Sequence, residues 1–312
     1  MRYSITFSYV GAGFCGWQKQ PSDPSVQDCL ENALSTLLGG DIPVTGAGRT
    51  DTDVNAIGYV ACFDGPEGLA AEDFRYKLNA ILPRRVAVLS ITPASPEFHA
   101  RFDATRREYT YFLHRGKDPF MEKFSWQYGY PDVDFEAMNR AAELLVGTHD
   151  FSCFEKAGAD NKTSVCTVYE AFWKPYTPSH VQIMGEVAAA PARAAGGTAP
   201  SSAAGKGQVR VPQGGPGTCI ARPYDALTGA VPEPQYWYFR ISADRFLRNM
   251  VRAVVGTLLE VGRGKRPADS FAELVLPAPA PGIALPKAGT PLRSLAGQSV
   301  PGHALFLSKV LY

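Results

Sequence analysis

A glycine-rich run that holds one arginine and one aspartate is the segment best suited to chemistry in this 312-residue chain. Residues 46–51 read Gly-Ala-Gly-Arg-Thr-Asp, so Asp51 stands two positions after Arg49. Glycine lets other backbone approach closely, which is typical of a tight loop. The apolar residues 57–63 predict a buried strand directly after the loop. Because a nearby guanidinium favours the ionised form of a carboxylate, we expect Asp51 to be a charged group at the entrance of that strand.

Two plainer interpretations of this run stay open on its residues alone. Arg49 and Asp51 could form an ion pair whose only role is to hold a turn. Asp51 and Asp53 would share one face of an extended segment, as the paired carboxylates of a hydrolase must. The choice between these interpretations and a single catalytic aspartate depends on the other motifs of the chain.

A predicted helix over residues 245–261 carries the clearest signal for nucleic acid. At about 100° per residue, Arg245, Arg248 and Arg252 fall on the side opposite the apolar residues. No acidic side chain follows any of them by four positions, as a neutralising helical pair would require. Arginine forks bind phosphates, so this side predicts contact with RNA backbone. Gly256 continues the basic side, and we expect open space above it.

A predicted strand over residues 107–114 contributes further polar side chains. Arg107, Tyr109 and Tyr111 alternate along it and therefore share one of its faces. A tyrosine in such a strand is usually a core residue, so the pattern alone leaves the role of Tyr109 open.

The first loop of the chain has the spacing of a dinucleotide-binding motif but not its context. Residues 11–16 spell G-x-G-x-x-G after a strand, and that motif requires a helix to begin inside it. Here proline residues such as Pro21 delay the next helix to Ser25. We therefore expect no nicotinamide site, and Gln18 and Lys19 are instead predicted to contact RNA backbone.

Five segments, taken in chain order, resemble motifs of the tRNA pseudouridine synthase A family. They are residues 9–20, 46–51, 98–111, 147–151 and 246–262, and the resemblance covers most of residues 1–186 and 236–312. It implies an isomerase that converts uridine to pseudouridine at positions 38–40 of the tRNA anticodon stem-loop. It also implies that the enzyme needs no cofactor and acts as a homodimer.

The resemblance assigns roles to individual side chains. The catalytic residues it implies are Asp51, Arg49, Tyr109 and Arg252, and those expected to bind RNA are Gln18, Lys19, Arg107, Arg245 and Arg248. Asp51 would either attack C1′ of the ribose or remove the proton from C2′. The alternative from another class is a tRNA-binding homologue that has lost turnover.

The chain departs from the family pattern just after the aspartate. The family usually has glycine near position 53 and histidine near position 55, where this chain has Asp53 and Asn55. This difference puts local RNA contacts in question and leaves Arg49, Thr50 and Asp51 intact.

Alternating helix and strand patterns predict an α/β chain in two halves with a boundary near residue 103. Residues 1–103 would carry the aspartate loop, and residues 104–312 the tyrosine strand and the arginine helix. Periodicity does not choose between parallel and antiparallel sheets. The resemblance implies two ferredoxin-like halves whose largely antiparallel sheets meet at a central cleft. The expected helices span 25–38, 70–82, 134–146 and 245–261, and the expected strands 3–9, 57–63, 86–91, 107–114, 164–174, 180–184, 236–242 and 304–311.

Residues 187–235 differ in composition from the rest of the chain. They are rich in alanine, glycine and proline and too poor in large apolar side chains to build a core. We expect an insertion between two strands.

Composition limits the remaining classes of function. The net charge of +1 argues against a broadly basic surface, so any RNA-binding surface must be local. No apolar run has the length of a membrane span, and the six cysteines form no C-x-x-C pair, which is typical of reduced thiols in a cytoplasmic protein without a leader segment. His149, Asp150 and Cys153 fit no zinc spacing, so no metal site is expected.

Overall fold

The computed structural model describes residues 1–156, 158, 163–188, 234–277 and 292–312, so the expected insertion lies almost entirely outside the described residues. Its strands are β1 (Arg2–Tyr9), β2 (Thr45–Gly46), β3 (Asn55–Asp64), β4 (Val86–Pro93), β5 (Arg106–His114), β6 (Trp126–Gln127), β7 (Gly147–Asp150), β8 (Val165–Pro175), β9 (Tyr236–Ala243), β10 (Leu276–Pro277) and β11 (Leu305–Leu311). The α-helices are α1 (Val26–Leu38), α2 (Ala71–Ile81), α3 (Phe135–Glu143), α4 (Ser179–Ala188) and α5 (Met250–Gly262). Short 3-10 turns are η1 (Ser152–Phe154), η2 (Ala268–Glu273), η3 (Leu292–Leu295) and η4 (Gly302–Ala304).

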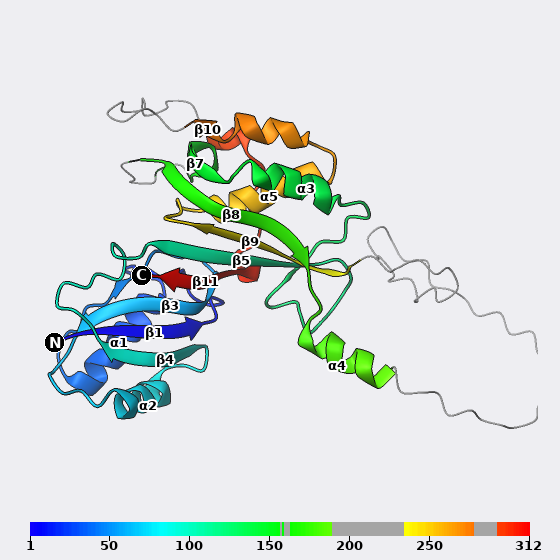
Figure 1. The fold of residues 1–312 in the computed structure, drawn as a ribbon. Coiled ribbons are helices and arrows are strands. Elements are labelled where there is room, and N and C mark those ends of the chain that lie inside the picture. The colour runs from blue at the N-terminus through cyan, green and yellow to red at the C-terminus, as the bar shows by residue number, and fades with distance from the viewer. Residues whose placement is uncertain (157, 159–162, 189–233, 278–291) are drawn as a thin grey trace, which may run out of the picture.

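Within the described ranges, the strands form one 11-stranded sheet in the order β10-β7-β8-β9-β5-β11-β3-β1-β4, and the short strands β2 and β6 pair with β3 and β5 (Figure 1). The pairs are antiparallel except β11 with β3 and β5 with β6. The predicted α/β class with largely antiparallel strands is confirmed. The C-terminal strand β11 lies between β5 and β3, so it joins the two halves into a single sheet rather than leaving two separate ones.

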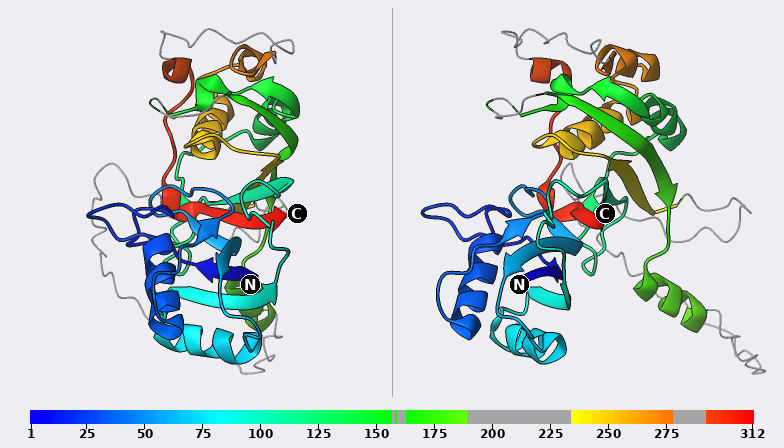
Figure 2. Two further views of the ribbon diagram at one scale, coloured as in Figure 1. Left: turned by 90° about the vertical axis from the view of Figure 1, so that its left-hand side faces the viewer. Right: turned by 60° about the vertical axis from the view of Figure 1, so that its left-hand side comes forward.

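Two hydrophobic cores lie against this sheet, one beside each pair of helices. Side chains of α1 and α2 pack with alternate residues of β1, such as Ile5 and Phe7. Side chains of α3 and α5 pack with β5, β8 and β9. Figures 1 and 2 show the two helix pairs toward opposite ends of the sheet, with β5 and β11 between them. Tyr109 of β5 packs against both cores and therefore marks their junction.

The start of α5 differs from the prediction. The helix begins at Met250, and the preceding Asn249 has a left-handed backbone with φ 65°. The side-chain Nδ2 of Asn249 donates to Ser299 Oγ at 2.6 Å, which ties this turn to a distant segment. Arg245 and Arg248 therefore lie in the loop before the helix, and the predicted arginine side of one helix is wrong.

The expected strand at 180–184 is also wrong, because these residues belong to α4 (Ser179–Ala188). The amides of Val181 and Gln182 both donate to Pro178 O at 3.0 Å, which begins a helical turn. A short apolar run does not distinguish strand from helix by periodicity alone.

The space above Gly256 is filled. A Cβ at this position would overlap the carbonyl oxygen of Gln298, whose main chain crosses α5 there. The expectation of open space for a nucleotide above Gly256 is therefore wrong. The glycine is required by backbone that approaches the helix closely.

This contact predicts an unusual sign for a glycine-to-alanine change in a helix. Alanine normally stabilises a helix interior by about 1 kcal/mol relative to glycine. We expect Gly256→Ala to lower the free energy of unfolding by about 1–3 kcal/mol instead, because the added methyl group must displace main chain. Chemical denaturation measures this, with Gly129→Ala as control, since a Cβ at Gly129 meets no heavy atom within 4 Å. A Gly256→Ala protein at least as stable as the parent would contradict the proposed packing.

Candidate active site

Asp51 and Arg252 face each other across the junction of the two cores. Asp51 precedes β3, Arg252 lies in the first turn of α5, and Arg252 Nη1 is 3.7 Å from Asp51 Oδ2. Their side chains are 26% and 22% exposed, so the pair is accessible from solvent. The guanidinium that compensates Asp51 thus comes from the other half of the chain. Arg49 is exposed, and within the described residues it forms no ion pair with Asp51.

Tyr109 lies beside this pair on β5. Burial raises the pKa of its phenol, the negative charge of Asp51 raises it further, and Arg107 opposes the shift. The phenol is therefore protonated at neutral pH and able to donate a hydrogen bond. The rings of Phe246 and Tyr109 are nearly perpendicular, with a centroid distance of 5.0 Å and an interplanar angle of 88°. These two rings give the site an aromatic wall.

The loop that carries Asp51 is held by hydrogen bonds from the sheet and from the first glycine loop. Tyr9 Oη and Thr50 Oγ1 are 2.8 Å apart, and the amide of Trp17 donates to Thr50 O at 3.2 Å. Tyr59 Oη donates to Gly48 O. Gly16 has φ 91°, and a Cβ there would overlap Thr50 O. The glycine loop thus packs on the Asp51 loop through its main chain, which explains its spacing without a dinucleotide.

Arg107 joins the Asp51 loop to its surroundings through all five of its N–H groups. Nε and Nη2 donate to Ala47 O at 3.2 and 2.8 Å, and Nη2 also donates to Arg101 O at 2.6 Å. Nη1 donates to Ala104 O at 3.2 Å and to Asp244 O at 2.7 Å. Burial lowers the pKa of Arg107. The occupied donors favour a bracing role over the expected phosphate contact.

Arg252 is held by the segment that leads into β11. Its Nε donates to Val300 O at 2.7 Å, and the amide of Val300 donates to Arg252 O at 3.2 Å. Two residues on, a Cβ at Gly302 would lie 2.5 Å from Thr52 O, next to Asp51. One segment therefore contacts both members of the ion pair.

Asn55 is a buried residue that connects two segments, a role that the sequence did not predict. It is 2% exposed, its Oδ1 accepts from the amide of Gly11 at 2.9 Å, and its Nδ2 donates to His303 O at 2.7 Å. The one indication in the sequence was that Asn55 replaces the histidine usual in the family. Because the side chain is enclosed, the exchange at this position concerns the framework of the loop rather than a surface contact.

Asp53 does not share a strand face with Asp51. Asp53 has φ 64°, and the amide of Val54 donates back to Asp51 O at 3.2 Å, which makes the segment a turn. Left-handed backbone favours glycine, which accounts for the glycine of the family pattern. The extended geometry on which the paired-carboxylate interpretation rests is absent from this turn.

The residues expected to contact RNA differ in their surroundings. Gln18 and Arg248 are exposed, and Arg245 is partly buried, with its amide donating to Asp244 Oδ1 at 2.7 Å. Lys19 Nζ lies 3.2 Å from Asp28 Oδ1 and 3.3 Å from a carboxylate of α1, Glu31 Oε2.

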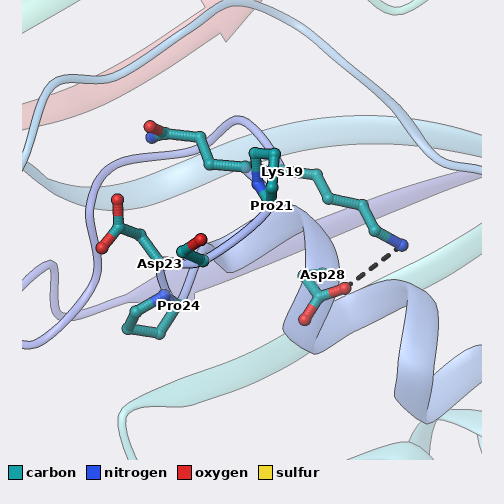
Figure 3. Close-up of a pocket in the computed structure, with 7 residues that line it drawn as sticks. Lys19, Pro21, Asp23, Pro24 and Asp28 are labelled. Carbon is teal, nitrogen blue, oxygen red and sulfur yellow. Dashed lines mark ion pairs between the residues drawn. The ribbon is translucent and has the colours of Figure 1, made fainter.

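Figure 3 shows the pocket beside Lys19, with the Lys19–Asp28 ion pair along its wall. Hydrogen bonds to the two acidic side chains raise the pKa of Lys19. Its charge is already compensated, which weakens its case as a phosphate ligand.

Neither a metal-binding cluster nor a membrane-spanning helix occurs among the described residues. No cluster of three or more His, Cys, Asp or Glu side chains there could hold a metal ion. No helix among them has the length and apolar character needed to cross a membrane.

The sequence matches known proteins along its whole length. A family model described as tRNA pseudouridine synthase matches residues 5–103 and 141–312. The chain belongs to this family. It is 37% identical over 313 residues to tRNA pseudouridine synthase A of Parabacteroides distasonis, a match that covers all of this chain and 96% of the relative. It is 33% identical over 315 residues to the Bacillus licheniformis protein of that name, covering all of this chain and 99% of the relative.

The bracing of the loop in this tRNA pseudouridine synthase family member can be tested at Arg107. Arg107→Lys keeps the positive charge but cannot supply a planar set of five donors. We expect it to lower the free energy of unfolding by about 2–4 kcal/mol, since several charge-assisted hydrogen bonds are lost inside the protein. Denaturation curves measure the change.

The neighbouring Arg106 provides a matched control. It pairs with Glu170 at 2.8 Å on a partly exposed surface. Arg106→Lys should therefore cost less than about 1 kcal/mol. Equal effects of the two substitutions would contradict the bracing role of Arg107.

Proposed function

We propose that this protein isomerises uridine to pseudouridine in tRNA, with Asp51 as the catalytic carboxylate. The observation that carries the proposal is the 3.7 Å approach of Arg252 Nη1 to Asp51 Oδ2 beside Tyr109, in a member of the tRNA pseudouridine synthase family. These three side chains come from three distant parts of the chain. The sequence resemblance further supports uridines 38–40 of the anticodon stem-loop as targets and a homodimer as the active form.

The reaction exchanges one bond of the nucleotide for another. The N1–C1′ bond of uridine breaks, the uracil turns, and a C5–C1′ bond forms. The proton on C5 is lost and N1 gains one, so the atoms balance and no electrons are transferred to another molecule. The chemistry that the protein must supply is a nucleophile or base at the ribose, a binding surface for the free uracil and a path for one proton.

Asp51 can serve either of two routes at the ribose. Its carboxylate attacks C1′ and displaces the uracil anion, or it removes the C2′ proton so that the uracil leaves by elimination. In both routes Asp51 must be ionised and must reach the sugar. The guanidinium of Arg252 faces the carboxylate, and the 26% exposure of the Asp51 side chain leaves it open to the substrate.

Tyr109 and Phe246 would bind the base. A uridine inside a stem must leave its stack to reach Asp51, at a cost of about a few kcal/mol. The ring of Tyr109 offers a face for the extruded uracil. Its protonated phenol can also donate to a uracil carbonyl or relay the proton that leaves C5. Phe246 fixes the orientation of the Tyr109 ring by its edge contact.

Exposed arginines near the site would bind the RNA around the target. Arg49 lies two positions before Asp51 with its side chain exposed, where it could occupy the space vacated by the flipped base. Arg248 is exposed in the loop before α5 and is a candidate phosphate ligand.

Release of tritium from C5 tests the reaction directly. We expect the protein to release tritium from tRNA labelled at uridine C5, because that hydrogen is lost in each turnover. Asp51→Asn should abolish the release while changing tRNA affinity by less than about threefold, since one carboxylate contributes little to phosphate binding. A wild-type protein that binds tRNA but releases no tritium would support the silent-homologue alternative.

Asp53→Asn is the matched control for the aspartate. Asp53 lies in the adjacent turn, and no catalytic role is proposed for it. Its turnover should stay close to wild type. An inactive Asp53→Asn with an active Asp51→Asn would refute the assignment and restore the paired-carboxylate interpretation.

Arg252→Lys separates catalysis from binding. Lysine keeps the charge but loses the Nε hydrogen bond to Val300 O and the planar fork. We expect the single-turnover rate to fall by about 10- to 100-fold at saturating enzyme, because the group facing Asp51 is no longer held. Affinity for tRNA should change little.

The matched comparison is Arg248→Ala, which should behave in the opposite way. Loss of one phosphate contact should weaken binding and reduce the salt slope by about one unit. The rate at saturation should be retained. Full activity of Arg252→Lys, or an unchanged salt slope of Arg248→Ala, would contradict these roles.

A further inference from the structure

A short turn before β5 displays an aromatic ring and a guanidinium that the reaction does not use. We define it as the 99–103 turn. Phe102 is 74% exposed, and Arg101 Cζ lies 5.6 Å from the centroid of its ring. The imidazole of His99 also contacts the Phe102 ring, at a centroid distance of 4.3 Å. Single exposed phenylalanines are common in folded proteins, so only the residues around Phe102 can indicate a function for it.

The 99–103 turn is held rigidly by its own hydrogen bonds. His99 Nδ1 accepts from the amides of Arg101 and Phe102 at 3.2 and 3.3 Å. Asp103 Oδ2 accepts from the amide of His99 at 2.9 Å, and the amide of Asp103 donates to His99 O at 3.1 Å. Tyr312 Oη at the C-terminus donates to Ala100 O at 2.7 Å. The ring is therefore presented in a fixed position, which lowers the entropy lost when a ligand binds.

Arg107 couples this turn to the catalytic loop. Its Nη2 donates both to Arg101 O and to Ala47 O, at 2.6 and 2.8 Å. Ala47 stands four residues before Asp51, so Phe102 belongs to the same braced framework as the catalytic carboxylate. The main-chain path limits the separation of the turn from Asp51 to about 20 Å. A stacked strand advances about 3.4 Å per nucleotide, so a substrate nucleotide within about six positions of the target could reach Phe102.

The charge around the ring favours an anionic ligand. Among the described residues, no carboxylate pairs with the guanidinium of Arg101, and its charge contributes to lowering the pKa of Arg107 nearby. Asp103 accepts instead from the main chain of His99. An aromatic face beside an uncompensated arginine matches a nucleotide, whose base stacks and whose phosphate is negative.

We propose that Phe102 and Arg101 form a stacking site for one nucleotide of the tRNA that flanks the target uridine. The base stacks on the exposed ring of Phe102, and Arg101 contacts the adjoining phosphate. Stacking on an aromatic ring tolerates any base, so the site would anchor different tRNAs in the same register relative to Asp51. This proposal rests on the proposed function, since it names a contact with the same substrate.

Binding of a fluorescent tRNA transcript, measured by anisotropy, tests the site without requiring turnover. Phe102→Ala should weaken binding by about tenfold, which is the usual effect of removing one base-stacking side chain. Phe102→Tyr should retain the affinity because the ring is kept. Tyr76→Ala is the matched control, since Tyr76 is 73% exposed on α2, away from the turn. It should bind as wild type does.

Two further measurements are the salt dependence of binding by Arg101→Ala and the single-turnover rate of Phe102→Ala. Arg101→Ala should reduce the salt slope by about one unit, and Phe102→Ala should raise the enzyme concentration for half-maximal single turnover without lowering the maximal rate. A Phe102→Ala protein that binds tRNA as Tyr76→Ala does would overturn the proposal. So would a Phe102→Ala change in sedimentation without RNA, which would assign the ring to a second copy of the chain. If the wild-type protein releases no tritium but Phe102→Ala still weakens tRNA binding, the stacking site is retained and only the proposed reaction is refuted.

Discussion

The partly buried guanidinium of Arg107 makes the hydrogen bonds on which the active site depends. A charge removed from water is costly unless its hydrogen bonds are met, and here five N–H groups reach four main-chain carbonyls in three separate stretches of chain. Those stretches include the start of the Asp51 loop and, at Asp244, the end of the strand that leads toward α5. Because carbonyls do not move without their backbone, the fork fixes the spacing of loops that no regular element connects.

A second set of main-chain contacts, made by the segment that leads into β11, holds Arg252. Val300 exchanges two hydrogen bonds with Arg252, and Gly302 packs on the main chain of Thr52. The same segment then enters β11, the strand that joins both halves of the sheet. Asn55 links these segments, because its side chain forms hydrogen bonds with both Gly11 of the first glycine loop and His303. Asp51 and Arg252 are thus positioned by shared backbone, and their ion pair is a consequence of the fold rather than its cause.

The parts of this arrangement that sequence could predict are local. Alternation identified β1 and β5, and α1 does start at Ser25 as expected, where Ser25 Oγ accepts from the amide of Asp28 at 3.1 Å. Motif resemblance selected Asp51, Tyr109 and Arg252, although their functional roles stay predictions. The start of α5 could not be read from its neighbours, because Asn249 takes its left-handed turn against Ser299, fifty residues later. The bracing role of Arg107 was equally hidden, since periodicity places a side chain on a face but does not name what it meets there.

The geometry of the ion pair has a chemical consequence for Asp51. At 3.7 Å, Arg252 Nη1 is too far for a direct hydrogen bond yet close enough to balance the carboxylate charge. Within the described part of the chain, no donor is hydrogen-bonded to the carboxylate oxygens of Asp51. A carboxylate tied by several hydrogen bonds would have its lone pairs engaged and its basicity reduced. Arg252 is anchored through Nε to Val300 O, which holds its guanidinium opposite the carboxylate. Asp51 therefore faces a positive charge while its side chain stays partly open to solvent.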